Sequence, residues 1–236
     1  MKVCVIGARG GSKGLKNKNI KELLGKPLIA WSIETALQSK YIDEVYISTD
    51  CKDIAETAER YGAKVEFMRP DELANDSAGK WEVWQHALSE LNKLKDGKID
   101  TYIDLDCTSP LRDVSDIDRA IELYENSKCD GVFSVCEARK NPYFNVVEAN
   151  SEGFFEMSKT LANPIVRRQD APKVYEHVAS IYVMGADYIK NGTGLLSGET
   201  IGYDIGQEKC FDVDSELDFE LVEYFMRKKL HEQSKR

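Results

Sequence analysis

Residues 2–14 read KVCVIGARGGSKG, a short apolar run rich in β-branched residues that leads directly into a glycine-rich loop. The apolar run predicts a buried strand. Because Gly10 and Gly11 have no Cβ atoms, their backbone N–H groups can approach an anion closely. Arg9 adds a planar fork of donors and Lys13 a point charge, which together suit a triphosphate. The stretch therefore predicts a phosphate-binding loop at the end of the first strand, with a solvated basic turn as the alternative.

The loop differs from two familiar nucleotide-binding motifs. A Walker A loop requires glycine at the sixth position, but the sixth position counted from Gly7 is Ser12. The dinucleotide-binding fingerprint requires glycines at positions i, i+2 and i+5, and the loop has no such set. An NAD-dependent oxidoreductase is therefore disfavoured.

Strand-like and helix-like segments alternate through the first 136 residues. The predicted strands are 2–6, 44–48, 64–68, 101–106 and 131–136, and the predicted helices are 28–37, 52–61, 80–94 and 115–127. This alternation predicts an α/β fold with a doubly wound, mostly parallel sheet. Ligands bind beyond the carboxyl ends of the strands in such sheets. We therefore expect the loops to converge on one site, namely the loops at 7–19, 49–51, 69–80 and 106–113.

The alternation ends after the fifth predicted strand. Residues 139–176 contain loops punctuated by proline and short strand-like pieces such as 144–149, which we interpret as an excursion that meets another subunit. Residues 178–183 predict a further strand, and residues 215–230 predict a closing amphipathic helix. We expect residues 1–236 to form a single domain that includes this excursion.

The composition describes a folded, acidic protein. The chain is 42% hydrophobic and 31% charged, with a formal net charge of −9, which excludes a disordered chain and disfavours a general nucleic-acid binder. We expect no membrane span and no leader peptide, because no apolar run approaches roughly 20 residues. The six cysteines and three histidines lack metal-ligand spacing. We therefore expect a cytoplasmic protein whose chemistry relies on aspartate, lysine, arginine and backbone amides.

Six short islands of sequence lie in order over nearly the whole chain. They are Ala8 to Gly14, Lys18-Asn19, Arg69-Pro70, Thr108 to Arg112, Ile181-Tyr182 and Asp212 to Asp218. Together the islands resemble the acylneuraminate cytidylyltransferases, also called CMP-sialic acid synthetases. The resemblance implies an α/β fold of nucleotidyltransferase type. It also implies a homodimer in which the extension of one subunit reaches into the site of the other.

The resemblance further implies an activity and a set of site residues. The activity is transfer of CMP from CTP to the anomeric hydroxyl of a nine-carbon (nonulosonic) sugar acid, with release of pyrophosphate and with Mg²⁺ as cofactor. The implied nucleotide-binding residues are Ala8, Arg9, Gly10, Gly11, Ser12, Lys18, Asn19 and Arg69. The implied catalytic residues are Arg9, Lys13, Lys18 and Asp214. The product would serve the synthesis of bacterial surface glycans.

Two Asp-x-Asp pairs are candidates for acidic chemistry. Asp212 and Asp214 stand two residues apart and share one face of an extended segment. The resemblance assigns both to the metal, whereas from the residues alone Asp214 is equally suited to capping the helix that begins near Ser215. Asp104 and Asp106 form a rival pair near the end of a predicted strand.

Asp106 is the main departure from the family pattern, which usually has a neutral glutamine there in contact with the sugar. An ionised aspartate accepts hydrogen bonds but cannot donate them, and it would repel the carboxylate of the sugar. It therefore predicts a different sugar acid or an additional metal ligand. On the sugar side, Arg168 is a candidate partner for the sugar carboxylate, or else a solvated charge. Tyr182 is a candidate wall of the pocket, while Trp81 and Trp84 fit the core better than a ligand stack.

Several substrates and one further class of protein stay open at this point. Sialic, legionaminic and other nonulosonic acids are all compatible with the sequence. One alternative is a nucleotidyltransferase for an eight-carbon 2-keto acid or for a sugar phosphate. Another is a nucleotide-binding module without catalysis, which predicts CTP binding without turnover. The presence of both Asp212 and Asp214 argues against such a module.

Overall fold

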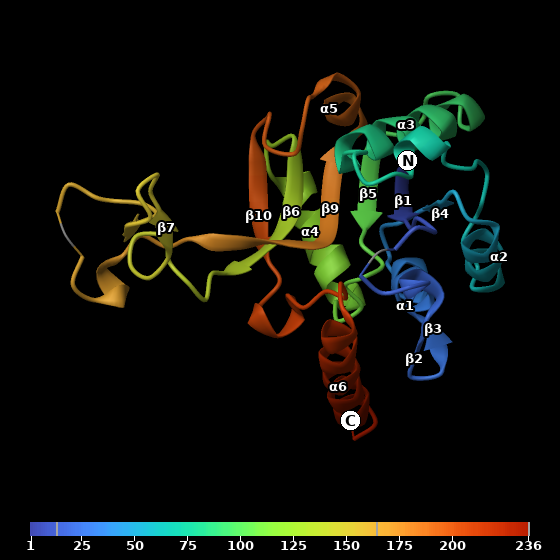
Figure 1. Cartoon of the computed structure of the whole chain (residues 1–236). Helices are drawn as coiled ribbons and strands as arrows, with labels where there is room; N and C mark the ends of the chain where they lie inside the picture. Colours follow the sequence, from blue (N-terminus) through green and yellow to red (C-terminus); the bar gives the residue numbers. More distant parts are fainter. Residues whose placement is uncertain (13, 164, 236) are drawn as a thin grey trace.

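The computed structural model describes residues 1–12, 14–163 and 165–235, and it has one central sheet with helices on both faces (Figure 1). The strands of the sheet are β1 (Lys2–Gly7), β4 (Glu44–Ser48), β5 (Thr101–Leu105), β6 (Gly131–Glu137), β9 (Tyr175–Gly185) and β10 (Thr200–Asp204). Their spatial order is β10-β6-β9-β5-β1-β4. Strand β1 pairs in parallel with β4 and β5, and β6 with β10, while β9 runs antiparallel between β5 and β6. The predicted mostly parallel sheet is confirmed.

Helices cover both faces of this sheet. They are α1 (Leu28–Leu37), α2 (Lys52–Arg60), α3 (Lys80–Leu94), α4 (Val114–Asn126) and α5 (Ala186–Asn191). A further helix, α6 (Glu216–Gln233), packs beside α1 and away from the sheet (Figure 1). Successive side chains of β1 point to opposite faces, so Cys4 and Ile6 pack in the core formed with α1, α2 and α4. Val3 and Val5 pack in the second core, formed with α3 and α5. The sheet is therefore doubly wound, as expected.

One predicted strand is wrong. Residues 64–68 make only an isolated bridge, in which Lys64 pairs with Tyr46. The segment runs along the outer edge of β4 and is bonded to that edge of the sheet only at Lys64 and, through the Arg69 amide, at Thr49. The side chains alternate between half-buried and exposed, as in a strand, but the ladder between the two ends is missing. Periodicity predicted the alternation correctly and the backbone pairing incorrectly.

The shorter elements belong mainly to loops. They are the 3-10 turns η1 (Lys18–Ile20), η2 (Asp71–Leu73), η3 (Arg168–Asp170) and η4 (Gln207–Lys209), and the short strands β2 (Glu22–Leu23), β3 (Lys26–Pro27), β7 (Val147–Ala149) and β8 (Phe155–Met157). Strands β7 and β8 form a hairpin within the chain that connects β6 to β9. Figure 1 shows this connection projecting away from the sheet as an extension. Its exposed apolar side chains include Phe154 and Phe155.

Helix α6 closes the chain against a small third core. Its Phe219, Val222 and Met226 pack with Leu28 of α1 and with Leu111. None of the helices within the described ranges combines the length and the apolar character that a membrane crossing requires.

Candidate active site

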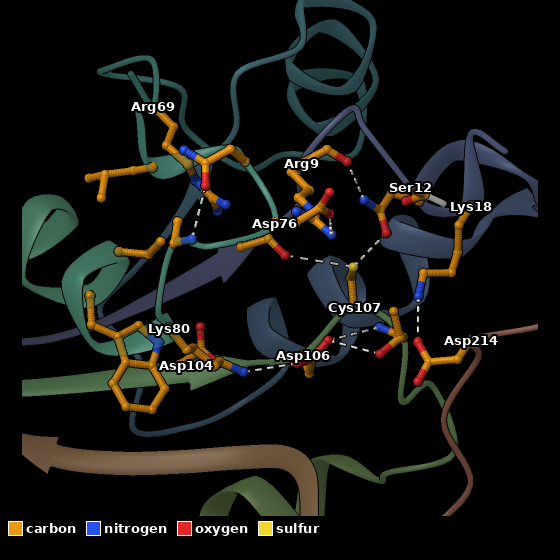
Figure 2. A pocket seen from close by; sticks show the side chains of 18 of the residues that line it. Arg9, Ser12, Lys18, Arg69, Asp76, Lys80, Asp104, Asp106, Cys107 and Asp214 are labelled. Carbon is orange, nitrogen blue, oxygen red and sulfur yellow. Dashed lines mark hydrogen bonds and ion pairs between the residues drawn. The ribbon is translucent and has the colours of Figure 1, made fainter. Parts of the chain in front are cut away.

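A cleft of about 410 Å³ lies beyond the carboxyl ends of β1 and β5 (Figure 2). Three of the four loops that we expected to converge supply lining residues, namely the loops at 7–19, 69–80 and 106–113. The fourth loop contributes indirectly, because the Asp50 carboxylate accepts a hydrogen bond from the Gly10 N–H at 2.8 Å. Asp214, which precedes α6, borders the cleft on the other side. The expected convergence is confirmed for three of the four loops, while the loop at 49–51 supplies no lining residue.

Two glycines let the first loop approach its neighbours closely. A Cβ atom at Gly14 would lie 2.2 Å from the carbonyl oxygen of Asp214, a distance that no real Cβ atom adopts. A Cβ atom at Gly10 would lie 3.0 Å from the Cβ of Cys51. Gly11 has open space around it, so a side chain there meets no neighbour. Gly14 therefore couples the loop to the segment that carries Asp214.

Asn19 fixes the loop from inside. It is buried, and its side-chain amide donates to the Arg9 carbonyl oxygen at 2.9 Å. Its carbonyl oxygen accepts from the Cys107 thiol at 3.0 Å. Burial raises the pKa of Cys107 to about 12, so this thiol keeps its proton as the donor. Ala8 is also buried, and its N–H donates to the Ser48 carbonyl oxygen at 3.0 Å.

The cations of the loop point into the cleft and pair with carboxylates (Figure 2). The Arg9 guanidinium lies 2.9 Å from Asp76, and the Lys18 ammonium lies 2.8 Å from Asp214. Ser12 lines the cleft between them. Lys13, which the sequence places among the catalytic candidates, lies outside the described residues. The arrangement concentrates exchangeable positive charge where a polyphosphate would be bound.

Arg69 enters the cleft from the loop that follows the edge segment. Its side chain is buried, and its guanidinium donates to the Ser48 hydroxyl at 3.1 Å and to the Ser48 carbonyl oxygen at 2.7 Å. Burial lowers the pKa of Arg69, and the charges of Asp50 and Asp104 oppose that shift. Held by neutral oxygens, the guanidinium stays available as a cation in the wall of the cleft.

Lys80 is a cleft residue that our sequence reasoning missed. It begins α3, and its ammonium lies 2.9 Å from Asp104 and 2.8 Å from Asp106. The shared lysine confirms that Asp104 and Asp106 occupy one face of the strand end. The ammonium also lies 4.3 Å from the centre of the Tyr182 ring. Two carboxylates at a buried strand end require a nearby cation. This requirement predicts that some lysine or arginine lies there, but the sequence does not indicate that the cation is Lys80.

The two carboxylates of this pair differ in their electrostatics. Burial would raise the pKa of Asp106, but the Lys80 ammonium and hydrogen bonds from Thr108 outweigh it and lower the pKa to about 2. The Thr108 hydroxyl donates to Asp106 Oδ1 at 2.9 Å. Burial raises the pKa of Asp104, and the charge of Asp106 adds to that effect while Lys80 opposes it. Asp106 is thus the carboxylate that stays firmly ionised.

Asp212 and Asp214 lie on the chain just before α6. Burial raises the pKa of the half-buried Asp212, and the nearby charges of Asp214 and Asp106 raise it further. Asp214 is exposed and pairs with Lys18. The residue that caps α6 is Ser215, whose hydroxyl accepts from the Asp218 N–H, and the two residues form a capping box. The capping role considered for Asp214 is therefore filled by its neighbour.

The two remaining sugar-side candidates lie apart from each other. Tyr182 is buried in β9, and its ring packs against the Lys80 ammonium and against Trp84, whose ring centre is 5.0 Å away. Trp81 and Trp84 are both buried in the core, as predicted. Arg168 lies in the extension, in a separate cavity of about 410 Å³ lined by residues of the extension and the end of β6. Within one chain, the structure does not bring Arg168 to the cleft.

Arg112 is a second residue whose role the sequence did not predict, although it is the last residue of the Thr108 to Arg112 island. It is fully buried and donates to the carbonyl oxygens of Asp106 and Ser109, each at 2.6 Å, and to the hydroxyl of Ser32. Burial lowers the pKa of Arg112, an effect that the charge of Asp106 opposes. Arg112 therefore shapes the turn after β5 from behind the cleft.

Comparison with known proteins agrees with this geometry. The family model described as Cytidylyltransferase matches residues 3–192. The CMP-N,N'-diacetyllegionaminic acid synthase of Campylobacter jejuni is 39% identical over 95% of this chain and 94% of its own. The post-translational flagellin modification protein B of Campylobacter coli is 38% identical over 96% of this chain and 95% of its own.

Two more distant proteins resemble this chain in sequence or in fold. The N-acylneuraminate cytidylyltransferase of Escherichia coli is 33% identical over 96% of this chain, which spans 52% of that protein. The solved structure of a CMP:2-keto-3-deoxy-manno-octonic acid synthetase complexed with CTP superposes with a TM-score of 0.71 at 20% identity, covering 97% of this chain and 99% of that one. The resemblance inferred from the sequence islands is confirmed, and the chain belongs to the cytidylyltransferase family.

Proposed function

We propose that this protein transfers CMP from CTP to the anomeric hydroxyl of a nonulosonic acid. The observation that carries the proposal is one cleft beyond the carboxyl ends of β1 and β5. It is lined by cations, among them Arg9, Lys18 and Arg69, and by the carboxylates of Asp76, Asp104, Asp106 and Asp214. The names of the relatives at 33–39% identity support a nonulosonic acid as the acceptor. A legionaminic-type acid is the first candidate, because the relative at 39% identity bears that name.

The reaction is an in-line displacement at the α-phosphorus of CTP. The anomeric hydroxyl oxygen forms a bond to that phosphorus, the bond from the α-phosphorus to the bridging oxygen breaks, and pyrophosphate leaves with the electron pair. The hydroxyl proton passes to a carboxylate or to water. Arg9 and Lys18 would exchange their carboxylate partners for phosphate oxygens and so neutralise the charge on the leaving group. This reaction requires no covalent nucleophile from the protein.

We further propose Mg²⁺ as the cofactor, held by Asp212 and Asp214. Among the described residues, no three Cys, His, Asp or Glu side chains form a complete metal cluster. Mg²⁺ needs only one or two carboxylates beside phosphate oxygens and water, so a pair is sufficient. Burial and, after it, the charges of Asp214 and Asp106 raise the pKa of Asp212, and a bound cation would oppose that shift. When bound, Mg²⁺ would neutralise phosphate charge and orient the α-phosphate.

A homodimer built on the extension completes the proposal. Phe154, Phe155 and Val166 are 65%, 74% and 84% exposed, so the extension presents apolar surface that a second copy would cover. Arg168 on the same extension would then reach the cleft of the partner. Light scattering on a Phe154→Ser/Phe155→Ser variant tests the dimer, and a variant that keeps the dimeric mass would contradict it. The CTP substrate and six free thiols support a cytosolic location.

One experiment tests the activity. Pyrophosphate release is measured with Mg²⁺ across CTP, UTP, ATP and GTP, each combined with sialic, legionaminic and pseudaminic acids, an eight-carbon 2-keto acid and a sugar phosphate. We expect release only with CTP and a nonulosonic acid. Release with the eight-carbon acid or the sugar phosphate alone would replace the proposed acceptor. CTP binding without release from any pair would favour the non-catalytic module.

A further inference from the structure

Lys80 and Lys18 lie at opposite ends of the same cleft (Figure 2). In Figure 2, Lys18 and Asp214 lie at one end of the cleft and Lys80 with Asp104 at the other, with Asp106 between them. Lys18 is therefore positioned by Asp214 and not by Lys80. The Lys80 side chain is nevertheless held in a defined position, and this position requires a separate explanation.

The surroundings of Lys80 fix its ammonium group beside two carboxylates. Asp104 and Asp106 lie at 2.9 and 2.8 Å, and the rings of Tyr182 and Trp84 have their centres 4.3 and 5.5 Å from the nitrogen. Two carboxylates and two aromatic faces stabilise one charge. The Lys80 side chain is still 38% exposed toward the cleft, so the pair forms part of the wall that a ligand meets.

Asp106 is left able to act as an acceptor. Its Oδ2 pairs with Lys80, and its Oδ1 accepts from the Thr108 hydroxyl and, at 3.3 Å, from the Thr108 N–H. A carboxylate offers about four lone-pair positions, so an oxygen of Asp106 can still accept from a sugar O–H or N–H. An isolated aspartate at this place would also repel the carboxylate of the sugar.

We propose that Lys80 is a specificity-determining residue, which compensates the charge of Asp106 so that this carboxylate accepts hydrogen bonds from an anionic sugar without repelling it. The inference rests on the proposed function and deepens it, because it explains how an acidic substrate is accepted beside an aspartate. It also assigns a defined role to a lysine that the sequence predicted only as the start of a helix.

Other charged and titratable groups also face Asp106, from several elements. They are Asp104 of β5, Tyr182 of β9, Asp212 before α6, and Cys107 and Arg112 of the turn after β5. Arg112 donates to the backbone carbonyl oxygen of Asp106. Among the described residues, Lys80 is therefore the cation that bonds the carboxylate itself.

The test compares Lys80→Met with Lys93→Met, a matched lysine on the outer end of the same helix that pairs with Glu90. With whichever acid the wild type uses, Lys80→Met is expected to raise KM for the sugar on the order of tenfold and to leave KM for CTP within about twofold. Lys93→Met should match the wild type. Lys80→Gln, which keeps polarity without charge, serves as a second variant if Lys80→Met does not fold. Unchanged sugar KM in the folded charge-free variant would overturn the inference.

Two further readouts separate a charge effect from a structural one. In Lys80→Met/Asp106→Asn the charge at position 106 is removed, and burial, no longer opposed by Lys80, raises the pKa of Asp104 further and so favours its neutral form. KM for the sugar should therefore fall back toward the wild-type value. In Lys80→Met alone the pKa of Asp106 should rise from about 2, so KM should improve when the pH is lowered from 7 to 5. The wild type and the double variant should lack that improvement. A double variant no better than Lys80→Met would contradict the proposal.

A measurement without turnover distinguishes this inference from the proposed function. The carboxyl ¹³C resonance of Asp106, assigned with Asp106→Asn, reports its pKa directly. A pKa equal in the wild type and in Lys80→Met would overturn the pairing, even in an enzyme that makes CMP-nonulosonate. A wild type inert toward every sugar acid would instead contradict the proposed function.

Discussion

The two Asp-x-Asp pairs of this chain have the same spacing and opposite surroundings. Asp104 and Asp106 follow a buried strand, and their side chains are 4% and 22% exposed with one lysine between them. Asp212 and Asp214 lie on an irregular segment before α6, where the Asp214 side chain is 74% exposed. The first pair is fixed in the wall of the cleft, whereas the second stands at its rim.

This difference shows that the spacing of two aspartates determines whether they share a face of the chain, whereas their burial determines what they can bind. A partly buried charge network is costly to disturb, because removing one partner leaves an uncompensated charge. Because the Asp214 side chain is 74% exposed, its ion pair with Lys18 is worth about 1 kcal/mol or less, so a metal ion or a phosphate can replace either partner. The pair at the rim is therefore the better candidate for the proposed metal site, and the pair in the wall is the better candidate for the proposed sugar recognition.

The largest expected effect comes from breaking the pair at the rim. Asp214→Ala should lower Mg²⁺-dependent kcat on the order of 10²–10³-fold, because it removes a ligand that would hold the metal against the phosphates. The fold should survive, since the Asp214 side chain is exposed. Steady-state kinetics and circular dichroism measure both. Glu220→Ala, at an exposed carboxylate on α6, is the matched control. Near-normal activity of Asp214→Ala would remove this residue from the metal site.

A smaller loss is expected from the lysine that pairs with Asp214. Lys18→Met should lower kcat/KM for CTP about 10- to 100-fold, because one cation that faces the phosphates is lost. Lys16→Met, at an exposed lysine two residues away, should change it less than twofold. Equal losses in both variants would mean that the loop contributes only general positive charge.

Much of the fold could be predicted from the sequence, because apolar periodicity reports burial. The glycine-rich loop, the doubly wound sheet and the capping box of α6 are all local patterns, and the structure has each of them. The segment at 64–68 shows the limit of this reasoning. Its side chains alternate correctly, but periodicity does not report whether a neighbouring backbone is in register.

The site was predictable where its residues follow strand ends and unpredictable where distant elements meet. Lys80 starts a helix, a place where a lysine is normally solvated, and only the packing of α3 on β5 brings it to Asp104. From the sequence, Arg112 is expected to be an exposed charge, but the turn after β5 buries it completely. Arg168 lies in a separate cavity of the extension. Its proposed contact with the sugar would require a second chain.

The proposed role of the pair in the wall is tested by replacing Asp106 with a residue that still accepts hydrogen bonds. Asp106→Gln should shift the relative kcat/KM among sugar acids by roughly three- to tenfold, because an amide donates as well as accepts. KM for CTP should change less, since the phosphate cations lie at the other end of the cleft. A competition assay with paired sugar acids measures the ratio. An unchanged sugar profile would exclude Asp106 from sugar recognition.

The smallest expected effect is on stability, and it distinguishes the capping of α6 from the proposed role of Asp214 in turnover. Ser215→Ala removes the hydroxyl that accepts from the Asp218 N–H, so the free energy of unfolding should fall by about 1 kcal/mol. Ser234→Ala, at the other end of α6, should change it by less than about 0.5 kcal/mol. Urea unfolding measures both. The kcat of Ser215→Ala should stay within a few-fold of the wild type, because the contacts of Asp214 do not use the Ser215 hydroxyl. Its carboxylate pairs with Lys18, its carbonyl oxygen approaches Gly14, and its N–H donates to the Asp218 carboxylate at 3.2 Å. A loss of turnover as large as that of Asp214→Ala, with no loss of stability, would place Ser215 itself among the metal-binding residues.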